Sequence, residues 1–322
     1  MRTPALFCLS LLTTLAPWAW ASVPIAPGIE LIPGAANANS QPDGNSVVIA
    51  AQDGFVVFDT GRHLPHTRQI IDLAQARQRP IVAIINSHWH LDHVGGNVLL
   101  RQAYPDAQVY ASSAMDQALG GFLADYRKQL TAALDQAPAG SPSRESLTAE
   151  VALIDAGPRL AATHVIGKSQ TMRVGGRKLE VHLERSAVTA GDVWVFDPGT
   201  RVLLAGDLVT LPAPFMDTAC PTRWRDSLSR LAARHFRILI PGHGLPMRPA
   251  GLDTYQRAFN ALLACTATRR PKGDCVNGWI SDAGELVAEA DRGYARALVD
   301  YYIDNVLRGD PARLAKLCTP LS

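Results

Sequence analysis

Four residues whose side chains bind metals lie within six positions of one another, directly after an apolar run. They are His88, His90, Asp92 and His93, in the segment 86–97. In an extended chain, residues two apart point to the same side, so His88 and His90 should converge. Asp92 and His93 should face the same place as the chain turns toward a helix. Imidazole and carboxylate ligands suit zinc, so the spacing predicts a metal site.

Apolar runs on both sides of this segment predict the elements that position it. Residues 46–51 and 55–61 are joined by an Asp-Gly turn and predict a β-hairpin. Residues 66–77 have helical spacing, and 81–85 form a buried strand that ends just before the metal-binding segment. A helix between two such strands is typical of an α/β fold.

The remaining pattern mixes further strands and helices. Residues 136–146 are rich in Pro, Ser and Gly, which predicts a mobile surface loop, either a lid or a linker. Helices are expected over 114–134, 253–265 and 285–307. Strands are expected at 109–112, 172–174, 179–183, 193–196, 202–204 and 238–240.

The first 21 residues have the pattern of a signal peptide. Met1 and Arg2 precede an apolar run over 5–18, and small residues end at Ala21. A membrane anchor is the alternative, but the run is shorter than the ~20 residues that a bilayer requires, and Pro17 interrupts it. We expect a mature protein in the periplasm or secreted, without a membrane span.

Removal of this leader leaves four cysteines, an even number that suits an oxidising compartment. A short polar stretch separates Cys265 from Cys275, which favours a disulfide between them and a second between Cys220 and Cys318. Free structural thiols are the alternative. The spacings do not match a cysteine zinc site.

The overall composition limits the class of partner. The 322 residues are 47% hydrophobic and carry 31 Lys and Arg against 29 Asp and Glu. This balance, without a basic run that contains aromatic residues, argues against nucleic acid. A small-molecule substrate is expected, and a protein partner is left open.

The chain resembles the metallo-β-lactamase superfamily over about residues 28–249. The His-x-His-x-Asp-His motif at 88–93 matches that family, as do the hairpin ending in Asp59-Thr-Gly61, the strand end Ala205-Gly-Asp207 and Pro241-Gly-His-Gly244. The resemblance implies an α/β, αββα sandwich over 22–249 with two metal positions at one edge of its sheets. Residues 250–322 would be a helical extension packed on it.

The resemblance also implies how the ligands are divided. His88 and His90 would hold the first metal together with a third histidine. Asp92, His93 and His243 would hold the second, and Asp207 would bridge the two. Asp92 would also orient the nucleophile and handle its proton, as the catalytic residue. Asp59 either supports a ligand histidine or caps a turn.

The sequence departs from the family pattern at the third histidine, where Val188 stands in the segment 187–192. Valine binds no metal, so the first site has fewer ligands and the second is expected to fill first, with one or two zinc ions per chain. His182, His164 or Glu184 are alternatives that would fill the gap.

These expectations favour a zinc-dependent hydrolase that uses a metal-bound hydroxide on a small ester, lactone, thioester, amide or phosphoester. β-Lactams are not favoured, because the lactamases of this family lack the bridging aspartate that Asp207 supplies, whereas glyoxalase II-like and lactonase-like members have it. The alternative is a periplasmic accessory or binding protein with a degenerate metal site, similar to sulfur-oxidation and quinoprotein-relay accessory hydrolases. A persulfide dioxygenase is disfavoured by Val188. Phe215 and Met216 either form an apolar wall or simply pack a loop.

Overall fold

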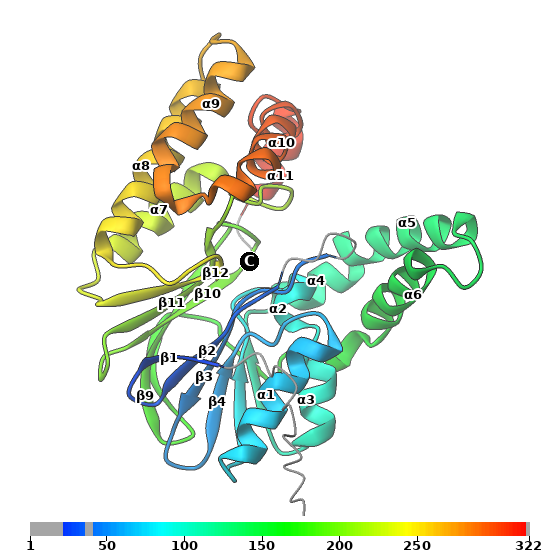
Figure 1. Ribbon diagram of the computed structural model, residues 1–322, viewed down its shortest axis with the longest axis vertical. Helices are drawn as coiled ribbons and strands as arrows, with labels where there is room; N and C mark the ends of the chain where they lie inside the picture. Colours follow the sequence, from blue (N-terminus) through cyan, green and yellow to red (C-terminus); the bar gives the residue numbers. More distant parts are fainter. Residues whose placement is uncertain (1–21, 36–40, 320–322) are drawn as a thin grey trace, which may run out of the picture.

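Two β-sheets pack face to face in the computed structural model, which describes residues 22–35 and 41–319 (Figure 1). The predicted leader, 1–21, lies outside the described residues. The first sheet runs in the order β1 (Val23–Ala26), β2 (Ile29–Ile32), β3 (Ser46–Ala50), β4 (Phe55–Phe58), β5 (Ile81–Ile85), β6 (Gln108–Ala111), β7 (His164–Val165). The second runs in the order β12 (Ile238–His243), β11 (Val202–Thr210), β10 (Asp192–Asp197), β9 (Arg177–Glu184), β8 (Gln170–Val174).

Side chains alternate between the two faces of each sheet, as the period of a strand requires. In β4, Val56 and Phe58 pack between the sheets, whereas Phe55 and Val57 pack on the outer face. In β10, Val193 lies between the sheets. These runs are apolar throughout because both faces of the strands are buried.

Helices cover both outer faces, which confirms the predicted αββα sandwich (Figure 1). One face carries α1 (Leu64–Ala76) and α3 (Asn97–Ala103). The short helix α2 (Leu91–Val94) follows β5 and contains two of the predicted metal ligands. The other face carries α7 (Pro221–Ala232), α8 (Pro249–Thr266), α9 (Lys272–Ala283), α10 (Arg292–Tyr302) and α11 (Pro311–Leu317).

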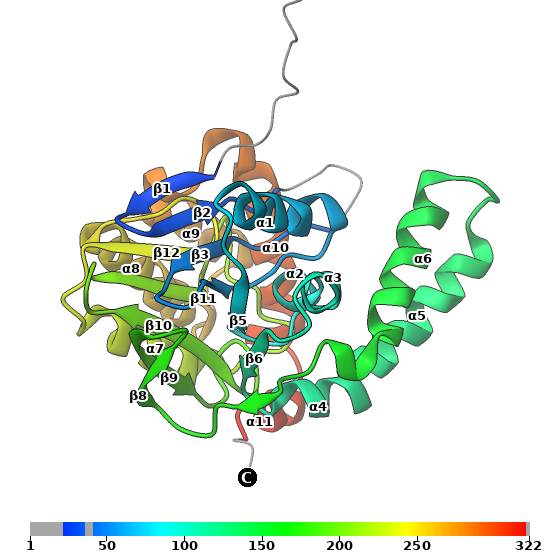
Figure 2. The same ribbon diagram turned by 90° about the horizontal axis from the view of Figure 1, so that it is seen from below.

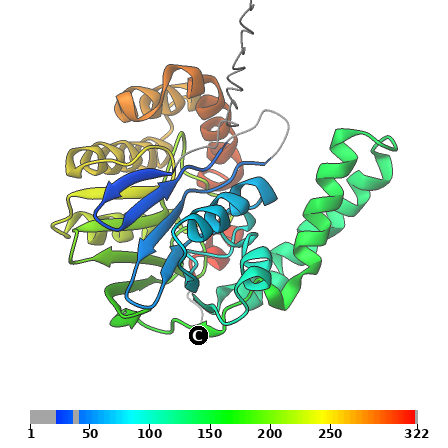
Figure 3. The same cartoon turned by 60° about the horizontal axis from the view of Figure 1, so that its bottom comes forward.

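A helical hairpin projects from the body of the molecule (Figure 2 and Figure 3). It contains α5 (Phe122–Gln136) and α6 (Pro142–Asp155), and α4 (Ala114–Gly120) leads into it. The prediction of a loop over 136–146 is therefore wrong for its second half. Ser141 accepts a hydrogen bond from the Arg144 N–H, and Pro142 occupies the first turn, so the two residues start a helix.

The C-terminal region is also more segmented than predicted. The expected helix over 285–307 is confirmed from Arg292 to Leu307 and is wrong before that, because Gly284–Leu286 and Glu289–Asp291 form 3-10 turns before α10 begins. Both favoured disulfides are confirmed: Cys220 is bonded to Cys318, and Cys265 to Cys275.

The helices after 249 share one apolar core with the second sheet. Leu203 and Leu239 of that sheet lie in the same cluster as Phe259 and Trp279 of α8 and α9. The division into a 22–249 domain and a 250–322 extension stays a prediction. Among the described helices, none combines the length and the apolar character needed to cross a membrane.

Candidate functional site

The six predicted ligand residues meet at one edge of the two sheets. His88 and His90 follow β5, Asp207 lies in β11, and His243 ends β12. Asp92 and His93 are in α2. The side chains form two groups, His88 with His90 and Asp207, and Asp92 with His93 and His243, and the ligand atoms within each group lie within 4.8 Å of one another.

In the second group, several ligand atoms converge at short range. His243 Nε2 lies 2.9 Å from Asp92 Oδ2. His93 Nε2 lies 3.3 Å from His243 Nε2 and 3.2 Å from Asp207 Oδ1. Two facing ring nitrogens beside two carboxylates form a donor set that suits a divalent cation.

In the first group, two ligand atoms are buried without a hydrogen-bond partner among the described residues. They are His88 Nε2 and Asp207 Oδ1. His88 Nε2 is 3.7 Å from Asp207 Oδ2. Buried polar atoms are nearly always paired in folded proteins, so these two fit a ligand that they would share. The residues at this edge therefore fit a metal centre.

Asp59 fixes which nitrogen of two histidines faces this edge. Ser87 Oγ donates to Asp59 Oδ2 (2.7 Å) and lies 2.9 Å from His88 Nδ1. Because the hydroxyl has one proton, His88 Nδ1–H must donate to it, which leaves Nε2 with a free lone pair. His93 Nδ1 contacts Asp59 Oδ2 at 2.8 Å, so its Nε2 is left free as well. These contacts agree with the expected supporting role of Asp59.

Thr218 fixes which ring nitrogen of His90 carries the proton. Its hydroxyl donates to the Val188 carbonyl oxygen (2.9 Å), and it lies 2.9 Å from His90 Nε2. His90 Nε2–H must therefore donate to Thr218, and Nδ1 keeps the lone pair. No sequence pattern indicates this contact, because 128 residues separate the two side chains.

Val188 is fully buried in the apolar cluster beside the second sheet. The three residues considered as replacements for the missing histidine make other contacts. His182 stacks on Trp194 with ring centroids 3.8 Å apart, and Glu184 accepts hydrogen bonds from Trp194 and Arg230. His164 is exposed and lies beside Tyr110. The described residues thus give the first group no third histidine.

Two glycines leave room for the ligands. A Cβ on Gly242 would lie 2.0 Å from Asp207 Oδ1, and one on Gly44 would lie 2.5 Å from the His93 ring. Both distances are far below van der Waals contact. Glycine is therefore required at each position for the close approach of main chain and ligand.

The ionisation of the histidines differs between the groups. Burial lowers the pKa of His88 and lowers that of His90 to about 4, so both rings are neutral and can offer a lone pair. Burial acts in the same direction on His93 and His243, but Asp207 and Asp92 outweigh it and raise the pKa of both rings. The second group therefore has the stronger attraction for positive charge.

Arg62 connects this edge to the helical hairpin, and sequence reasoning did not single it out. Arg62 NH2 lies 3.5 Å from Asp92 Oδ1, and NH1 forms an ion pair with Glu150 of α6. Tyr126 of α5 donates to the same carboxylate at 3.4 Å. The position of Arg62 directly after the Asp59-Thr-Gly61 turn was the available signal.

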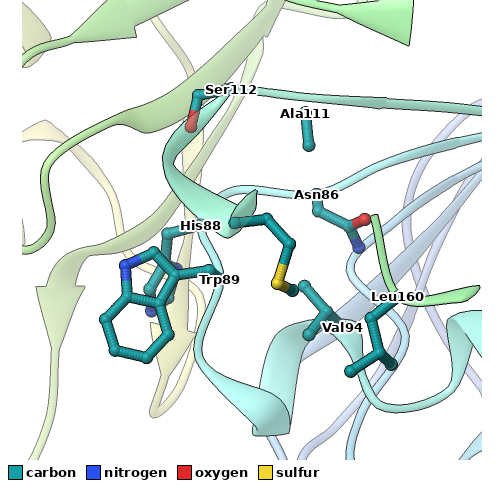
Figure 4. Close-up of a pocket in the computed structure, with 8 residues that line it drawn as sticks. Asn86, His88, Trp89, Val94, Ala111, Ser112 and Leu160 are labelled. Atoms are coloured by element: carbon teal, nitrogen blue, oxygen red, sulfur yellow. The ribbon is translucent and has the colours of Figure 1, made fainter. Parts of the chain in front are cut away.

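A small pocket lies beside His88, with Trp89 at one side and Asn86, Val94 and Leu160 at the other (Figure 4). Asn86 donates its amide protons to the His93 carbonyl oxygen and to Asn97. The pocket lining is mostly apolar, and its one amide is engaged. These residues pack against His88 and do not add to the donor set.

An αββα sandwich with two His/Asp groups at one sheet edge defines a class of metal-binding proteins. The sequence model described as "Metallo-beta-lactamase superfamily" matches residues 41–243. The chain belongs to this superfamily, which confirms the predicted family.

Individual relatives are more distant. A linear primary-alkylsulfatase of a Pseudomonas species is 24% identical over 231 residues, which are 62% of this chain and 41% of the relative. A hydroxyacylglutathione hydrolase of Gloeobacter violaceus is 40% identical over 72 residues, which are 20% of this chain and 28% of that protein. The chain thus spans less than half the length of these curated relatives.

A solved structure of a metallo-beta-lactamase from Pontibacter korlensis is similar in fold. Its TM-score is 0.53 at 18% identity, and the match covers 74% of this chain and 98% of the other. At this identity the likeness concerns the fold alone.

Proposed function

We propose that the protein is a zinc-dependent hydrolase of a small ester-like substrate. The observation that carries this proposal is the convergence of six His and Asp ligands in two adjacent groups. The family and the two named hydrolases support a metal-dependent hydrolase in general. Zinc bound here would act as a Lewis acid and bring the pKa of a water molecule to near ~7.

The chain's own residues have separate tasks. His88 and His90 each present an unprotonated ring nitrogen to the metal position. Ser87 contacts the other ring nitrogen of His88, and Thr218 contacts that of His90, so the orientation of both rings is fixed. Asp207 lies between the groups, 3.7 Å from His88 Nε2 and 3.2 Å from His93 Nε2, where it can serve both. These contacts preorganise the donor atoms before any ion binds.

Asp92 is proposed as the catalytic carboxylate as well as a ligand. Burial would raise its pKa, but His93, His243 and Arg62 hold the pKa well below its usual range. The carboxylate is therefore ionised and is available to orient a water proton, and its Oδ2 lies 2.9 Å from His243 Nε2, so both atoms face the same metal position. Arg62 also limits the freedom of its Oδ1.

The second group is proposed to bind zinc first. It holds three protein ligands with Asp207 beside them, whereas the first has two histidines and Asp207. Fewer ligands give weaker binding, so the protein would contain one tightly held and one labile ion.

The substrate classes proposed are carboxylic esters, lactones, thioesters, amides and phosphoesters. Sulfate esters join them because one relative is named an alkylsulfatase. We propose that the protein is exported through the leader at 1–21 and works in the periplasm or outside the cell.

A second candidate function is a periplasmic accessory or binding protein that uses this edge without turnover. Val188 favours it, since a centre that lacks a ligand can bind without catalysing. In this second candidate function, the metal-binding edge would bind a protein partner.

Elemental analysis and activity assays of the purified mature protein test both candidates. After dialysis against metal-free buffer, zinc is measured, and reporters for esters, lactones, thioesters, phosphodiesters, sulfates and β-lactams are assayed. One or more zinc ions per chain with turnover of a reporter supports the hydrolase, and His243→Ala should abolish both. Absence of metal and turnover would favour the binding protein.

A further inference from the structure

Glu150 is a buried charge on a hairpin whose helices are mostly exposed. Among the residues of α5 and α6, four are buried: Leu123, Leu130 and Ile154, which are apolar, and Glu150. A carboxylate taken out of water is unfavourable unless opposite charge and hydrogen bonds compensate for the lost hydration. Apolar residues in place of a buried ion pair often leave a protein equally stable. Docking of the hairpin alone therefore does not require a charge at this position.

The ion-pair partner of Glu150 is Arg62, which is buried as well. Arg62 NH1 contacts Glu150 Oε1, and each of the two side chains is 11% exposed. The Tyr126 hydroxyl donates to the same oxygen at 3.4 Å. Two donors, one from α5 and one from the loop after β4, thus hold one carboxylate oxygen of α6. Because the guanidinium is planar and rigid, a fixed NH1 also fixes the direction of NH2.

The main chain around Arg62 is bonded to the helix that carries Asp92. Two residues earlier, the Thr60 N–H donates to the His93 carbonyl oxygen in α2 at 2.9 Å. The Arg62 N–H donates to Asp43 Oδ1 at 2.6 Å. The side chain of Arg62 is therefore fixed at both ends, at its base by these hydrogen bonds and at its tip by the hairpin.

The two carboxylate oxygens of Asp92 have different partners. Oδ1 lies 3.5 Å from Arg62 NH2, and Oδ2 lies 2.9 Å from His243 Nε2. Oδ2 also lies 3.6 Å from His93 Nε2. One oxygen thus faces the guanidinium, and the other faces the remaining ligands of the second group. A contact of this kind limits rotation of a ligand carboxylate and keeps its donor atom directed at the ion.

We propose that Glu150 is a positioning residue for the metal centre: it holds Arg62, and Arg62 keeps Asp92 Oδ2 directed at the second ligand group. This proposal rests on the proposed ligand role of Asp92 and not on turnover. The charge of Glu150 acts in the same direction, because it offsets the charge of Arg62. Without it, the guanidinium would attract Asp92 more strongly and leave less negative charge for a cation. The projecting hairpin would thus set the metal affinity of the sheet edge.

Cobalt(II) binding to the metal-free protein tests the proposal without a substrate. Co²⁺ accepts the same imidazole and carboxylate ligands as zinc, and its visible spectrum changes with their geometry. Glu150→Gln keeps the size of the side chain and removes its charge. It should weaken the tighter Co²⁺ site about tenfold, the low end of the range for partners that orient a ligand, and change the spectrum. Affinity and spectrum equal to those of the wild type would overturn the proposal.

Asp155→Asn is the matched control on the same hairpin. Asp155 of α6 forms an ion pair with Arg127 of α5, with 2.5 Å between Oδ1 and Nε and 2.9 Å between Oδ2 and NH2. The side chains of this pair are 47% and 43% exposed. Its loss should leave the Co²⁺ affinity and spectrum unchanged. Equal weakening by Asp155→Asn and Glu150→Gln would show that general stability of the hairpin is responsible, which would overturn the proposal.

A double-mutant cycle tests whether Glu150 acts through Arg62. In the Arg62→Met background, Glu150→Gln should change the Co²⁺ affinity less than about twofold, because effects that share one route are not additive. A tenfold loss in both backgrounds would overturn the route through Arg62. Arg62→Met leaves a buried carboxylate unpaired, so circular dichroism checks that each variant is folded. If Arg62→Met does not fold, the comparison of Glu150→Gln with Asp155→Asn still decides.

The positioning role and the hydrolase function can fail separately. Failure of every reporter to turn over concerns the hydrolase alone, because Co²⁺ binding requires no catalysis. Co²⁺ binding by Glu150→Gln that equals the wild type would remove the positioning role and leave the hydrolase proposal in place, since the six ligands are unchanged. Absence of Co²⁺ binding by the wild type would overturn the metal centre on which both proposals rest.

Discussion

The two ligand groups share one sheet edge but differ in what holds them. In the first, Ser87 and Thr218 orient His88 and His90, so the imidazoles are aimed although Val188 stands where a third is expected. In the second, Asp59 orients His93, and three candidate ligands stand beside the shared Asp207. The two groups therefore differ in the number of ligands. In both groups, neighbouring side chains fix the orientation of histidines.

The largest effect should come from removing a ligand of the complete group. His243→Ala should lose all tightly bound zinc and all hydrolytic activity, because the remaining His93 and Asp92 cannot hold the ion against dialysis. His90→Ala should keep close to one equivalent. Zinc analysis after dialysis measures both variants. If His243→Ala retained its zinc, the proposed order of filling would be wrong.

Adding a histidine at position 188 should bring the metal affinity of the first group closer to that of the second. Val188→His should bind the further equivalent roughly a hundredfold more tightly, since a four-ligand zinc site is worth ~10–16 kcal/mol in total. A competition titration with a chromophoric chelator gives the affinity, and circular dichroism checks that the buried histidine is tolerated. An unchanged curve from a folded variant would mean that side chain 188 does not reach the ion.

A smaller effect should follow when the orientation of His90 is released. Thr218→Val removes the hydroxyl that accepts from His90 Nε2 and should weaken the first group about tenfold, at the low end of what such supporting contacts contribute. Thr218→Ser keeps the hydroxyl and should bind as wild type does. The same chelator titration applies, and equal affinities for valine and serine would contradict the tautomer argument.

The last prediction concerns the stability of segment 187–192, in which Val188 stands at the ligand position, and not the affinity for metal. Asp192 accepts hydrogen bonds from Thr189, yet burial raises its pKa to about 8. The folded state then binds this proton more tightly than the unfolded state does, so its contribution to stability is lost as pH rises from ~4 to ~8.

Asp192→Asn cannot titrate, so relative to wild type it should gain on the order of 1–3 kcal/mol between pH 5 and 8. Urea unfolding of both proteins at each pH measures the free-energy difference. Parallel stability curves would show that Asp192 is ionised in the folded protein, and the segment would then be held by charge.

Local spacing predicted four of the six candidate ligands, and the resemblance to the family supplied Asp207 and His243. The motif at 88–93 follows a buried strand, and Asp207 and His243 belong to strands of the other sheet whose ends meet the same edge. The apolar runs likewise predicted β3, β4 and β5 well, because both faces of these strands are buried. Short-range patterns therefore sufficed for the motif and for these three strands.

What the sequence did not predict depends on contacts between distant residues. Arg62 meets Glu150 across 88 positions, and Thr218 meets His90 across 128, so no spacing rule applies. The start of helix α6 was not predicted, because the Pro and Ser residues of 136–146 indicated a loop although Ser141 caps the helix. His182 was a candidate ligand by type alone, and its stacking on Trp194 is a tertiary fact.

The disulfide between Cys220 and Cys318 determines when the surroundings of the site form as well as how they are arranged. It joins the loop that carries Phe215 and Thr218 to a residue 98 positions later. During synthesis, this loop is tied down only after Cys318 has been made and the two thiols have been oxidised. The segment that carries Cys318 thus completes the surroundings of the centre, and a reductant such as dithiothreitol becomes a means of loosening Thr218 without changing the sequence.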